Sequence, residues 1–394
     1  MKTNSVPKIR FKGFTDDWEQ RKLGEIAEFN PKSDLPDEFE YVDLESVVGT
    51  EMVFHRTENK ASAPSRAQRV AKTGDVFFQT VRPYQRNNYL FSMPYENYVF
   101  STGYAQMRPK INAAFLMCFL QTESFVQNVL DNCTGTSYPA INSSDLSNLK
   151  ISLPILKSEQ SKIGKLISNL DHLITLHQRK CEQTKELKKF MLQKMFPKKG
   201  EKNPEIRFPG FTDDWEQRKL SDVANHRGGT AIEKYFDKDG VYKVISIGSY
   251  GLNSQYVDQN IRAISNEITD GRVVNSGELT MVLNDKTANG TIIGRTLLVE
   301  KDNEYVINQR TEIISPKENF DSNFAYTILN GPFREKVKRI VQGGTQIYVN
   351  YPAVSNLNLE LPKIEEQQKI GSFFKQLDNT IALHQRKDFV RFTL

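Results

Sequence analysis

A seventeen-residue sequence that occurs twice constrains the fold of this chain more than any other feature. Residues 7–23 read PKIRFKGFTDDWEQRKL and residues 204–220 read PEIRFPGFTDDWEQRKL, so 15 of 17 positions are identical at an offset of 197. Residues 159–180 return at residues 366–387 with 13 of 22 positions identical, at an offset of 207. The segments between these repeats share almost nothing. The sequence therefore predicts one structural frame used twice around two different inserts.

The length and composition of the chain agree with two soluble domains. A chain of 394 residues is too long for one ordinary core, and 38% hydrophobic with 26% charged residues is typical of a globular protein. No apolar stretch is long enough to cross a bilayer, and the polar N-terminus lacks the apolar run of a secretory signal. We therefore expect a cytoplasmic protein with no membrane partner.

The two inserts are predicted to be mixed α/β modules with one order of elements. In the first, we expect a strand over residues 76–78, a helix over 113–130 and a strand over 149–153. In the second, we expect a strand over residues 277–283, a helix over 324–341 and a strand over 357–361. The shared order predicts two copies of one fold whose surfaces have diverged.

The repeat at residues 159–180 has the spacing of a coiled-coil seam. Apolar residues recur at alternating intervals of four and three, which predicts a helix over residues 158–196 that ends at Pro197. The second copy carries the same seam, so we expect the two helices to pack antiparallel, with two histidines at equivalent positions fixing the register. The pairing residues are expected to be Ile163, Ile167, Leu170, Ile174, His177, Ile370, Phe374, Leu377, Ile381 and His384.

After the shared HQRK sequence, the second helical repeat differs from the first. Residues 388–394 read DFVRFTL, a poor continuation of a helix, so we expect the second helical region to be shortened and its end to be irregular. The expected organisation follows the repeats: a first mixed α/β module (1–153, with the opening 7–23), a first helical region (154–197), a linker (198–205), a second module (206–360, with the opening 204–220) and a second helical region (361–394).

Motifs of catalysis are missing from the sequence. There is no GxxxxGK[ST] loop for ATP, no GxGxxG opening a helix, and no Asn/Asp-Pro-Pro-Tyr/Phe element of the kind that amino-methyltransferases carry. The three cysteines, Cys118, Cys133 and Cys181, have neither disulfide nor metal-ligand spacing, and we interpret them as reduced thiols. The sequence predicts a chain that is not an enzyme and that binds neither metal nor cofactor.

What remains fits recognition of DNA. The net charge is +5, and both inserts hold basic, amide and aromatic residues near predicted strand ends. Arginine can bind guanine edges in bidentate fashion, amides can read adenine, and both also bind phosphate, although such residues are ordinary on solvated surfaces too. The candidate DNA-binding residues are Arg66, Arg69, Arg82, Tyr84, Arg86, Asn87, Thr136 and Tyr138 in the first insert, and Lys286, Arg295, Arg310, Gln346 and Tyr348 in the second.

The whole chain resembles the specificity subunits of type I restriction–modification systems. The resemblance rests on both RFxGFTDDWEQRKL openings and on four further segments: residues 74–87 (GDVFFQTVRPYQRN), 134–153 (TGTSYPAINSSDLSNLKISL), 190–197 (FMLQKMFP) and 361–377 (LPKIEEQQKIGSFFKQL). It implies an α+β fold in which two mixed α/β target-recognition domains are separated by long helices that pack as an antiparallel coiled coil.

The resemblance also implies a set of partners. Each recognition domain would read one half of a split site in double-stranded DNA, and the helices would set the spacer and dock two modification subunits. Those subunits would bind S-adenosylmethionine, and restriction subunits would use ATP with magnesium. Two unlike inserts on one frame agree with this, because they predict an asymmetric target, whereas a true repeat would read a palindrome.

Two other classes of function stay open at this point. A tandem scaffold that binds proteins instead of DNA would also explain the repeat and the missing catalytic motifs. A DNA-cutting or DNA-modifying enzyme would need a catalytic constellation that the sequence does not present. The bases read and the spacer length do not follow from the sequence, because direct readout depends on loop geometry.

Overall fold

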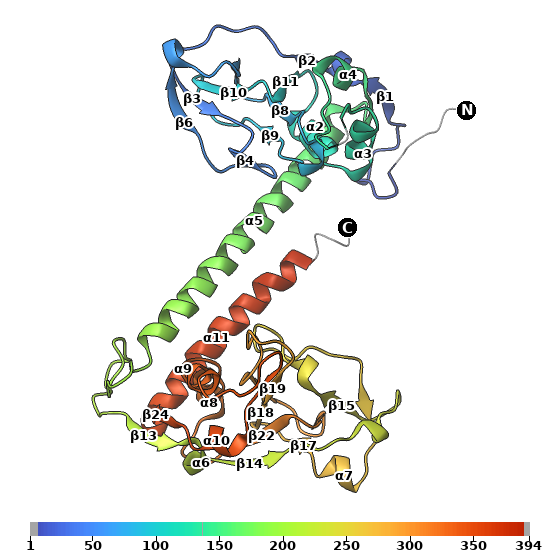
Figure 1. Ribbon diagram of the computed structural model, residues 1–394. Coiled ribbons are helices and arrows are strands. Elements are labelled where there is room, and N and C mark those ends of the chain that lie inside the picture. The colour runs from blue at the N-terminus through green and yellow to red at the C-terminus, as the bar shows by residue number, and fades with distance from the viewer. Residues whose placement is uncertain (1–6, 136, 390–394) are drawn as a thin grey trace. The chain divides into compact units, whose positions relative to one another are not determined.

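The computed structural model describes residues 7–135 and 137–389 of the chain. It divides the chain into two units, the first ending at Thr175 and the second beginning at Leu176. Helix α5 (Lys157–Lys194) is continuous across this boundary (Figure 1). Each unit has its own sheets and its own core, as the repeat predicts.

Unit 1 contains two four-stranded sheets. The first has the order β6-β3-β10-β7 (Arg56–Asn59, Glu38–Val42, Tyr98–Ser101, Ala67–Val70), and the second has the order β2-β11-β8-β9 (Ala27–Phe29, Tyr104–Pro109, Val76–Gln79, Tyr89–Leu90). Two strand pairs complete it: β1-β12 (Glu19–Lys22, Lys150–Leu153) and β4-β5 (Val47–Val48, Glu51–Met52). Its shorter helices are α1 (Leu23–Ile26), α2 (Ala113–Leu120), α3 (Glu123–Asp131) and α4 (Ser143–Asn148).

Unit 2 repeats the two four-stranded sheets with different residues. Its four-stranded sheets have the orders β16-β15-β21-β17 (Arg262–Ala263, Tyr242–Ile245, Tyr305–Ile307, Val273–Val274) and β14-β22-β18-β20 (Ala224–Gly228, Thr311–Pro316, Leu279–Val282, Thr296–Leu298). The strand pairs are β13-β24 (Glu216–Lys219, Asn358–Leu361) and β19-β23 (Asn284–Asp285, Ile347–Tyr348). The helices are α6 (Leu220–Val223), α7 (Glu267–Asp270), α8 (Ser322–Asn330), α9 (Pro332–Lys338), α10 (Tyr351–Ser355) and α11 (Ile364–Phe389).

The four-stranded sheets of the two units match strand by strand, whereas the short pairs β4-β5 and β19-β23 have no counterpart strand pair among the described residues of the other unit. In each, one sheet contains a single parallel pair, β3 with β10 in unit 1 and β15 with β21 in unit 2, while the other sheet is antiparallel throughout. The repeated opening forms the first strand of the pair β1-β12 or β13-β24. The predicted fold class, two mixed α/β modules with long helices, is confirmed.

A glycine turn precedes β8 in unit 1 and β18 in unit 2, and it helps to explain why the two units form the same sheet although their sequences differ. Gly74 and Gly277 adopt φ values of 95° and 84°, which favour glycine. Each precedes an acidic residue that closes the turn: the carboxylate of Asp75 accepts from Lys72 N at 2.9 Å, and that of Glu278 accepts from Asn275 N at 2.7 Å. The same turn therefore starts the same strand in both units.

The repeated opening is attached to the long helix by a buried ion pair in each unit. Arg10 Nε lies 2.6 Å from Glu159 Oε1, and Arg207 Nε lies 2.7 Å from Glu366 Oε1. Both glutamates have side chains that are 1% exposed. The second guanidinium nitrogen of each arginine donates to the other carboxylate oxygen at 2.8 Å. This bidentate geometry orients the opening segment on the base of the helix.

Two glycines let the same helices approach the domain cores closely. A Cβ added at Gly164 would lie 2.8 Å from Phe115 N, and one added at Gly371 would lie 2.6 Å from Phe324 N. Neither position has room for a side chain, because the contact in each case is backbone. The repeated Ile-Gly of the helical sequence is thus explained by packing against α2 and α8.

Three expectations from the sequence need correction. The single helix expected over 113–130 is two helices, because Thr122 accepts from Phe125 N and so begins α3 anew. The helix expected over 324–341 is likewise α8 and α9, since Pro332 has no N–H to continue α8 past Gly331. Helix α11 continues through Phe389, so the irregular end expected from residue 388 does not begin there, and residues 390–394 lie outside the described part.

Within residues 7–135 and 137–389, no helix is both long enough and apolar enough to span a membrane.

Candidate nucleic-acid interface

The loop between β8 and β9 of unit 1 is held in an unusual backbone conformation. Arg82 and Arg86 have φ values of 54° and 56°, a region that residues other than glycine rarely adopt. A buried amide network supports the loop: Gln79 Nε2 donates to Val81 O at 2.6 Å and to Gln85 Oε1 at 2.9 Å, and Gln79 N donates to the buried Asn88 Oδ1 at 2.9 Å. Strained residues held this way are typical of functional loops.

A second segment lies against this loop and adds an aromatic side chain. Arg82 N donates to Pro139 O at 2.8 Å, and the Arg82 guanidinium carbon lies 4.6 Å from the centre of the Tyr138 ring. Tyr138 is 64% exposed and Tyr84, in the middle of the loop, is 50% exposed. We call Arg82, Tyr84 and Tyr138 the first loop surface. A cation against one exposed ring, with a second exposed ring in the same loop, can bind phosphate and stack on bases.

Other residues predicted in unit 1 serve different roles. Arg86 forms an ion pair with Glu123, and its carbonyl accepts from Gln121 Nε2 at 3.1 Å, so this arginine anchors the loop to α3. Asn87 Oδ1 accepts from Gly49 N at 2.9 Å, which ties the loop to the turn between β4 and β5. Both side chains stabilise the loop.

The three remaining candidates of the first insert are scattered. Arg66 is exposed just before β7. Arg69 lies half-buried on β7, burial lowers its pKa, and its Nε has no hydrogen-bond partner among the described residues. Thr136 lies outside the described residues. Of the predicted set, the structure brings Arg82 and Tyr138 into contact and places the exposed Tyr84 in the same loop as Arg82.

In unit 2 the corresponding region is organised by a buried aspartate. Asp285 is 3% exposed, and its carboxylate accepts from Thr287 N at 2.9 Å, Thr287 Oγ1 at 2.8 Å and Ile292 N at 2.8 Å. Burial alone would raise the pKa of Asp285, but these donors hold the pKa below its ordinary value. The ionised carboxylate therefore fixes the loop that follows β19.

Four of the predicted residues surround this loop, and we call them the second loop surface: Lys286, Arg310, Gln346 and Tyr348. Lys286 directly follows β19 and Gln346 directly precedes β23, the strands that pair through Asp285 and Ile347, and both side chains are exposed. Arg310 has a φ of 68° and its carbonyl accepts from Leu283 N at 2.9 Å, while Tyr348 is 38% exposed. Like the first loop surface, this one combines cations with an exposed aromatic ring, and it adds the exposed amide of Gln346.

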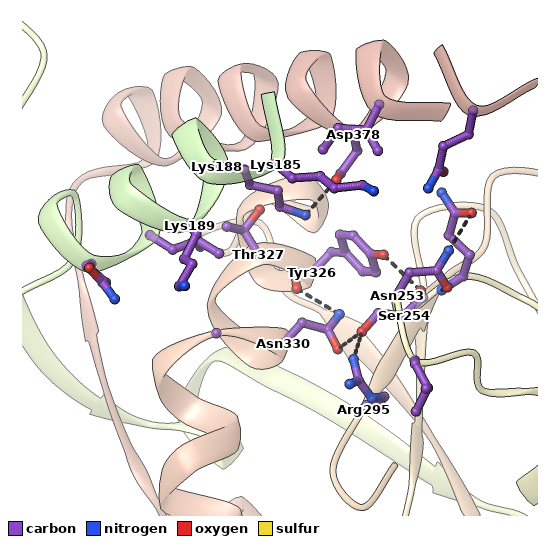
Figure 2. A pocket seen from close by; sticks show the side chains of 17 residues that line it. Lys185, Lys188, Lys189, Asn253, Ser254, Arg295, Tyr326, Thr327, Asn330 and Asp378 are labelled. Atoms are coloured by element: carbon purple, nitrogen blue, oxygen red, sulfur yellow. Dashed lines mark hydrogen bonds and ion pairs between the residues drawn. The ribbon is translucent and has the colours of Figure 1, made fainter. Parts of the chain in front are cut away.

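Arg295 is separate from this group. Figure 2 shows it in a pocket of about 470 Å³ within unit 2, with Ser254 and Asn330 beside it. Its Nη1 donates to Ser254 Oγ at 2.9 Å and its Nε to Thr291 O at 2.9 Å, and burial lowers its pKa. Lys188 and Asp378 form an ion pair of 2.5 Å across the same pocket. The side chain of Arg295 therefore cross-links loops within the unit.

The helical residues fall into two groups. In unit 2, α11 packs antiparallel on the second half of α5: the Nδ1 atoms of His177 and His384 lie 3.0 Å apart, and Cys181 Sγ lies 4.0 Å from Ile381 O. The remaining predicted residues contact the domain cores or lie near the surface. Ile370 and Phe374 are buried in the core of unit 2, and Leu377 is partly buried against it. In unit 1, Ile163 packs on the core and Ile167 lines an apolar cavity. Ile174 is half-buried and Leu170 is 41% exposed.

Sequence reasoning missed the importance of two aromatic pairs. Trp18 contacts Phe115 and Trp215 contacts Phe324, with ring centroids 5.9 Å and 6.0 Å apart. The end of α5 packs on the second pair, where Phe196 is 4% exposed. The apolar residues Met195 and Phe196, directly before Pro197, were the sequence signal that could have indicated this packing. Within the described ranges, no group of three His, Cys, Asp or Glu side chains is arranged to hold a metal ion.

Comparison with known proteins identifies similar chains. A family model described as type I restriction modification DNA specificity domain matches residues 15–186 and 212–388. The MjaVIII type I restriction enzyme specificity subunit of Methanocaldococcus jannaschii is 28% identical over 278 residues, which cover 67% of this chain and 63% of that protein. The HindI specificity subunit of Haemophilus influenzae is 26% identical over 175 residues, covering 41% of this chain and 37% of that protein. The chain thus spans less than two thirds of the length of these relatives.

One solved structure is similar over nearly the whole chain. The crystal structure of the S subunit of a type I restriction–modification system from M. genitalium covers 98% of this chain and 97% of that one, with a TM-score of 0.64 and 12% identity. At this identity the likeness concerns the fold.

Proposed function

Because this chain belongs to the type I restriction modification DNA specificity family, we propose that it is the non-catalytic subunit that selects the DNA site of a type I restriction–modification complex. Each unit reads one half of a bipartite, asymmetric site in double-stranded DNA. The long helices set the unspecified spacer between the two halves.

One observation carries this proposal: two modules with matching four-stranded sheets present unlike side chains at corresponding loops. Arg82, Tyr84 and Tyr138 form the first loop surface, while Lys286, Arg310, Gln346 and Tyr348 form the second. Both surfaces contain a cation and an exposed ring, which suit phosphate and base contacts. Their different residues suit two different half-sites. We propose that these seven residues contact DNA.

The partners follow from the same proposal. We propose that the helical regions dock two modification subunits and that restriction subunits join this assembly in the cytoplasm. Adenine methylation would use S-adenosylmethionine bound by the modification subunits, and cleavage would use ATP with magnesium bound by the restriction subunits. This chain would contribute site selection alone.

We assign the recognition domains to residues 1–153 and 206–360 and the helical regions to residues 154–197 and 361–394. Residues 198–205 would form the linker. Two features support this division: both proposed recognition domains end at the strand that pairs with the repeated opening, and a long helix follows each.

Genome-wide mapping of methylated adenine tests the proposal. Cells would express this chain together with its modification subunit, and a matched strain would express the modification subunit alone. The expected result is one split motif with two different halves, absent from the matched strain. A stable complex that produces no motif would contradict DNA reading, and would favour a scaffold that binds proteins.

A further inference from the structure

Each unit builds the same small apolar site where the repeated opening meets the base of a long helix. The offsets of 197 and 207 relate the residues of the two sites one to one. In unit 1 they are Ile9, Phe11, Trp18, Ile163, Leu166 and Ile167, and in unit 2 they are Ile206, Phe208, Trp215, Ile370, Phe373 and Phe374.

The walls of the two sites have the same geometry. The edge-on contact of Trp18 with Phe115 has a centroid distance of 5.9 Å, and the matching contact of Trp215 with Phe324 has 6.0 Å. The bidentate arginine–glutamate pair described above joins the opening segment to the long helix in both units. The two sites therefore share their tryptophan and phenylalanine walls, while Leu166 and Ile167 of unit 1 stand where unit 2 has Phe373 and Phe374.

In unit 2 the site is filled by the end of helix α5 and the two residues that follow it. The ring of Phe196 lies 6.0 Å from that of Trp215, 5.8 Å from that of Phe324 and 6.1 Å from that of Phe374. Phe196 and Met195 are only 4% and 2% exposed. The sequence FMLQKMFP at residues 190–197 thus ends in a plug for an aromatic site.

In unit 1 no described residue takes the place of Phe196. The site is an open apolar cavity of about 290 Å³ between the opening segment and α5. Leu166 and Ile9, which line it, are 46% and 86% exposed. An aromatic-walled cavity that is filled in one unit and open in the other points to a missing occupant, since exposed apolar surfaces of this kind mark interaction sites.

We propose that the apolar site of unit 1 binds the end of a helix carried by a separate polypeptide. The occupant would present a methionine and a phenylalanine in the arrangement of residues 190–197, because Trp18 and Phe115 match two of the three rings that Phe196 contacts in unit 2, Trp215 and Phe324. A second copy of this chain cannot supply its own plug, since Met195 and Phe196 are already buried in unit 2 of that copy. The proposal is independent of DNA reading.

A binding assay with the full chain tests the proposal. A fluorescein-labelled peptide with the sequence of residues 176–197 is titrated with the protein, and its fluorescence anisotropy is measured. We expect saturable binding that weakens at least tenfold when the peptide carries Phe196→Ala. The same loss is expected with Leu166→Glu or Ile9→Glu in the chain, whereas Leu173→Glu, at an equally exposed site of α5 outside the cavity, leaves binding unchanged.

Circular dichroism and thermal unfolding of the three chain variants establish that each is folded. Absence of saturable binding would overturn the proposal. Binding that neither Leu166→Glu nor Ile9→Glu weakens would also overturn it, because the peptide would then occupy another site. Self-association of the chain in sedimentation velocity, abolished by Leu166→Glu, would assign the site to a second copy and would overturn the separate partner.

Discussion

The ion pair between Arg207 and Glu366 offers a direct measure of how the frame is held together. The substitution Glu366→Ala removes a carboxylate whose side chain is 1% exposed and which accepts two guanidinium hydrogen bonds, at 2.7 Å and 2.8 Å. Arg207 would remain 14% exposed and without its charged partner. Breaking a buried pair by removing one partner costs about 3–5 kcal/mol, whereas an exposed pair contributes about 0–1 kcal/mol.

The local geometry places the expected cost near the lower end of that range. Arg207 Nη2 also donates to Asp213 O at 2.7 Å, and its Nη1 donates to Asn203 Oδ1 at 2.9 Å, so two partners persist after the substitution. We therefore expect Glu366→Ala to lower the free energy of unfolding of unit 2 by about 3 kcal/mol. The matched control is Glu216→Ala, whose ion pair with Arg218 has side chains that are 69% and 53% exposed. It should lower the free energy by less than about 1 kcal/mol.

Urea unfolding followed by tryptophan fluorescence measures both values. The chain has two tryptophans, one in each unit, so a Trp18→Phe background leaves Trp215 to report on unit 2 alone. If Glu366→Ala lowers the free energy of unfolding by no more than Glu216→Ala does, the reasoning is refuted. It would mean that the opening segment is held on the helix by apolar packing and that the ion pair adds nothing.

Four further predictions concern DNA reading and stability. Inserting four helical residues after Leu170 lengthens α5 by about 6 Å. The spacer in the methylated motif should widen by about one to two base pairs, at roughly 3.4 Å each, while both half-sites stay unchanged. An unaltered spacer contradicts this prediction. Exchanging residues 24–152 for the insert of a relative should change one half-site only, and loss of both halves would exclude modular reading. Arg82→Ala should weaken DNA binding by the assembled complex by about three- to tenfold and reduce its salt dependence by about one phosphate contact. The control Lys150→Ala, at an exposed position, should change neither quantity. Titrations of DNA binding at several salt concentrations measure both. Burial raises the pKa of Glu312, so the folded state binds a proton more readily than the unfolded state does. The stability of the fold should therefore fall as the pH rises from the ordinary glutamate pKa through the raised value. Glu312→Gln should remove this fall, as measured by thermal unfolding at a series of pH values.

Much of the fold could be predicted because it depends on local sequence patterns that occur twice in the chain. The seam of residues 163–195 has the period of a helix, and the structure contains α5 at Lys157–Lys194. The strands expected over residues 76–78 and 277–283 are present as β8 (Val76–Gln79) and β18 (Leu279–Val282). The same approach failed where a short signal inside an apolar run decided the outcome, as at Thr122 and at Pro332, because a single cap or a missing N–H outweighs the periodicity around it.

The sequence by itself determined the duplicated frame, the long helices and the unlike inserts, since repeats and hydrophobic periods are properties of neighbouring residues. Only the tertiary structure decided which polar residues face outward. It placed Arg82 against Tyr138, which is 56 residues away in the chain, while Arg86 and Asn87 were bound internally and Arg295 entered a pocket. Such outcomes depend on which loops meet when the sheets close, and on the burial that each side chain then finds. The open cavity beside Trp18 is of the same kind: the repeat predicts its walls, and only the folded units reveal that one is filled and the other is not.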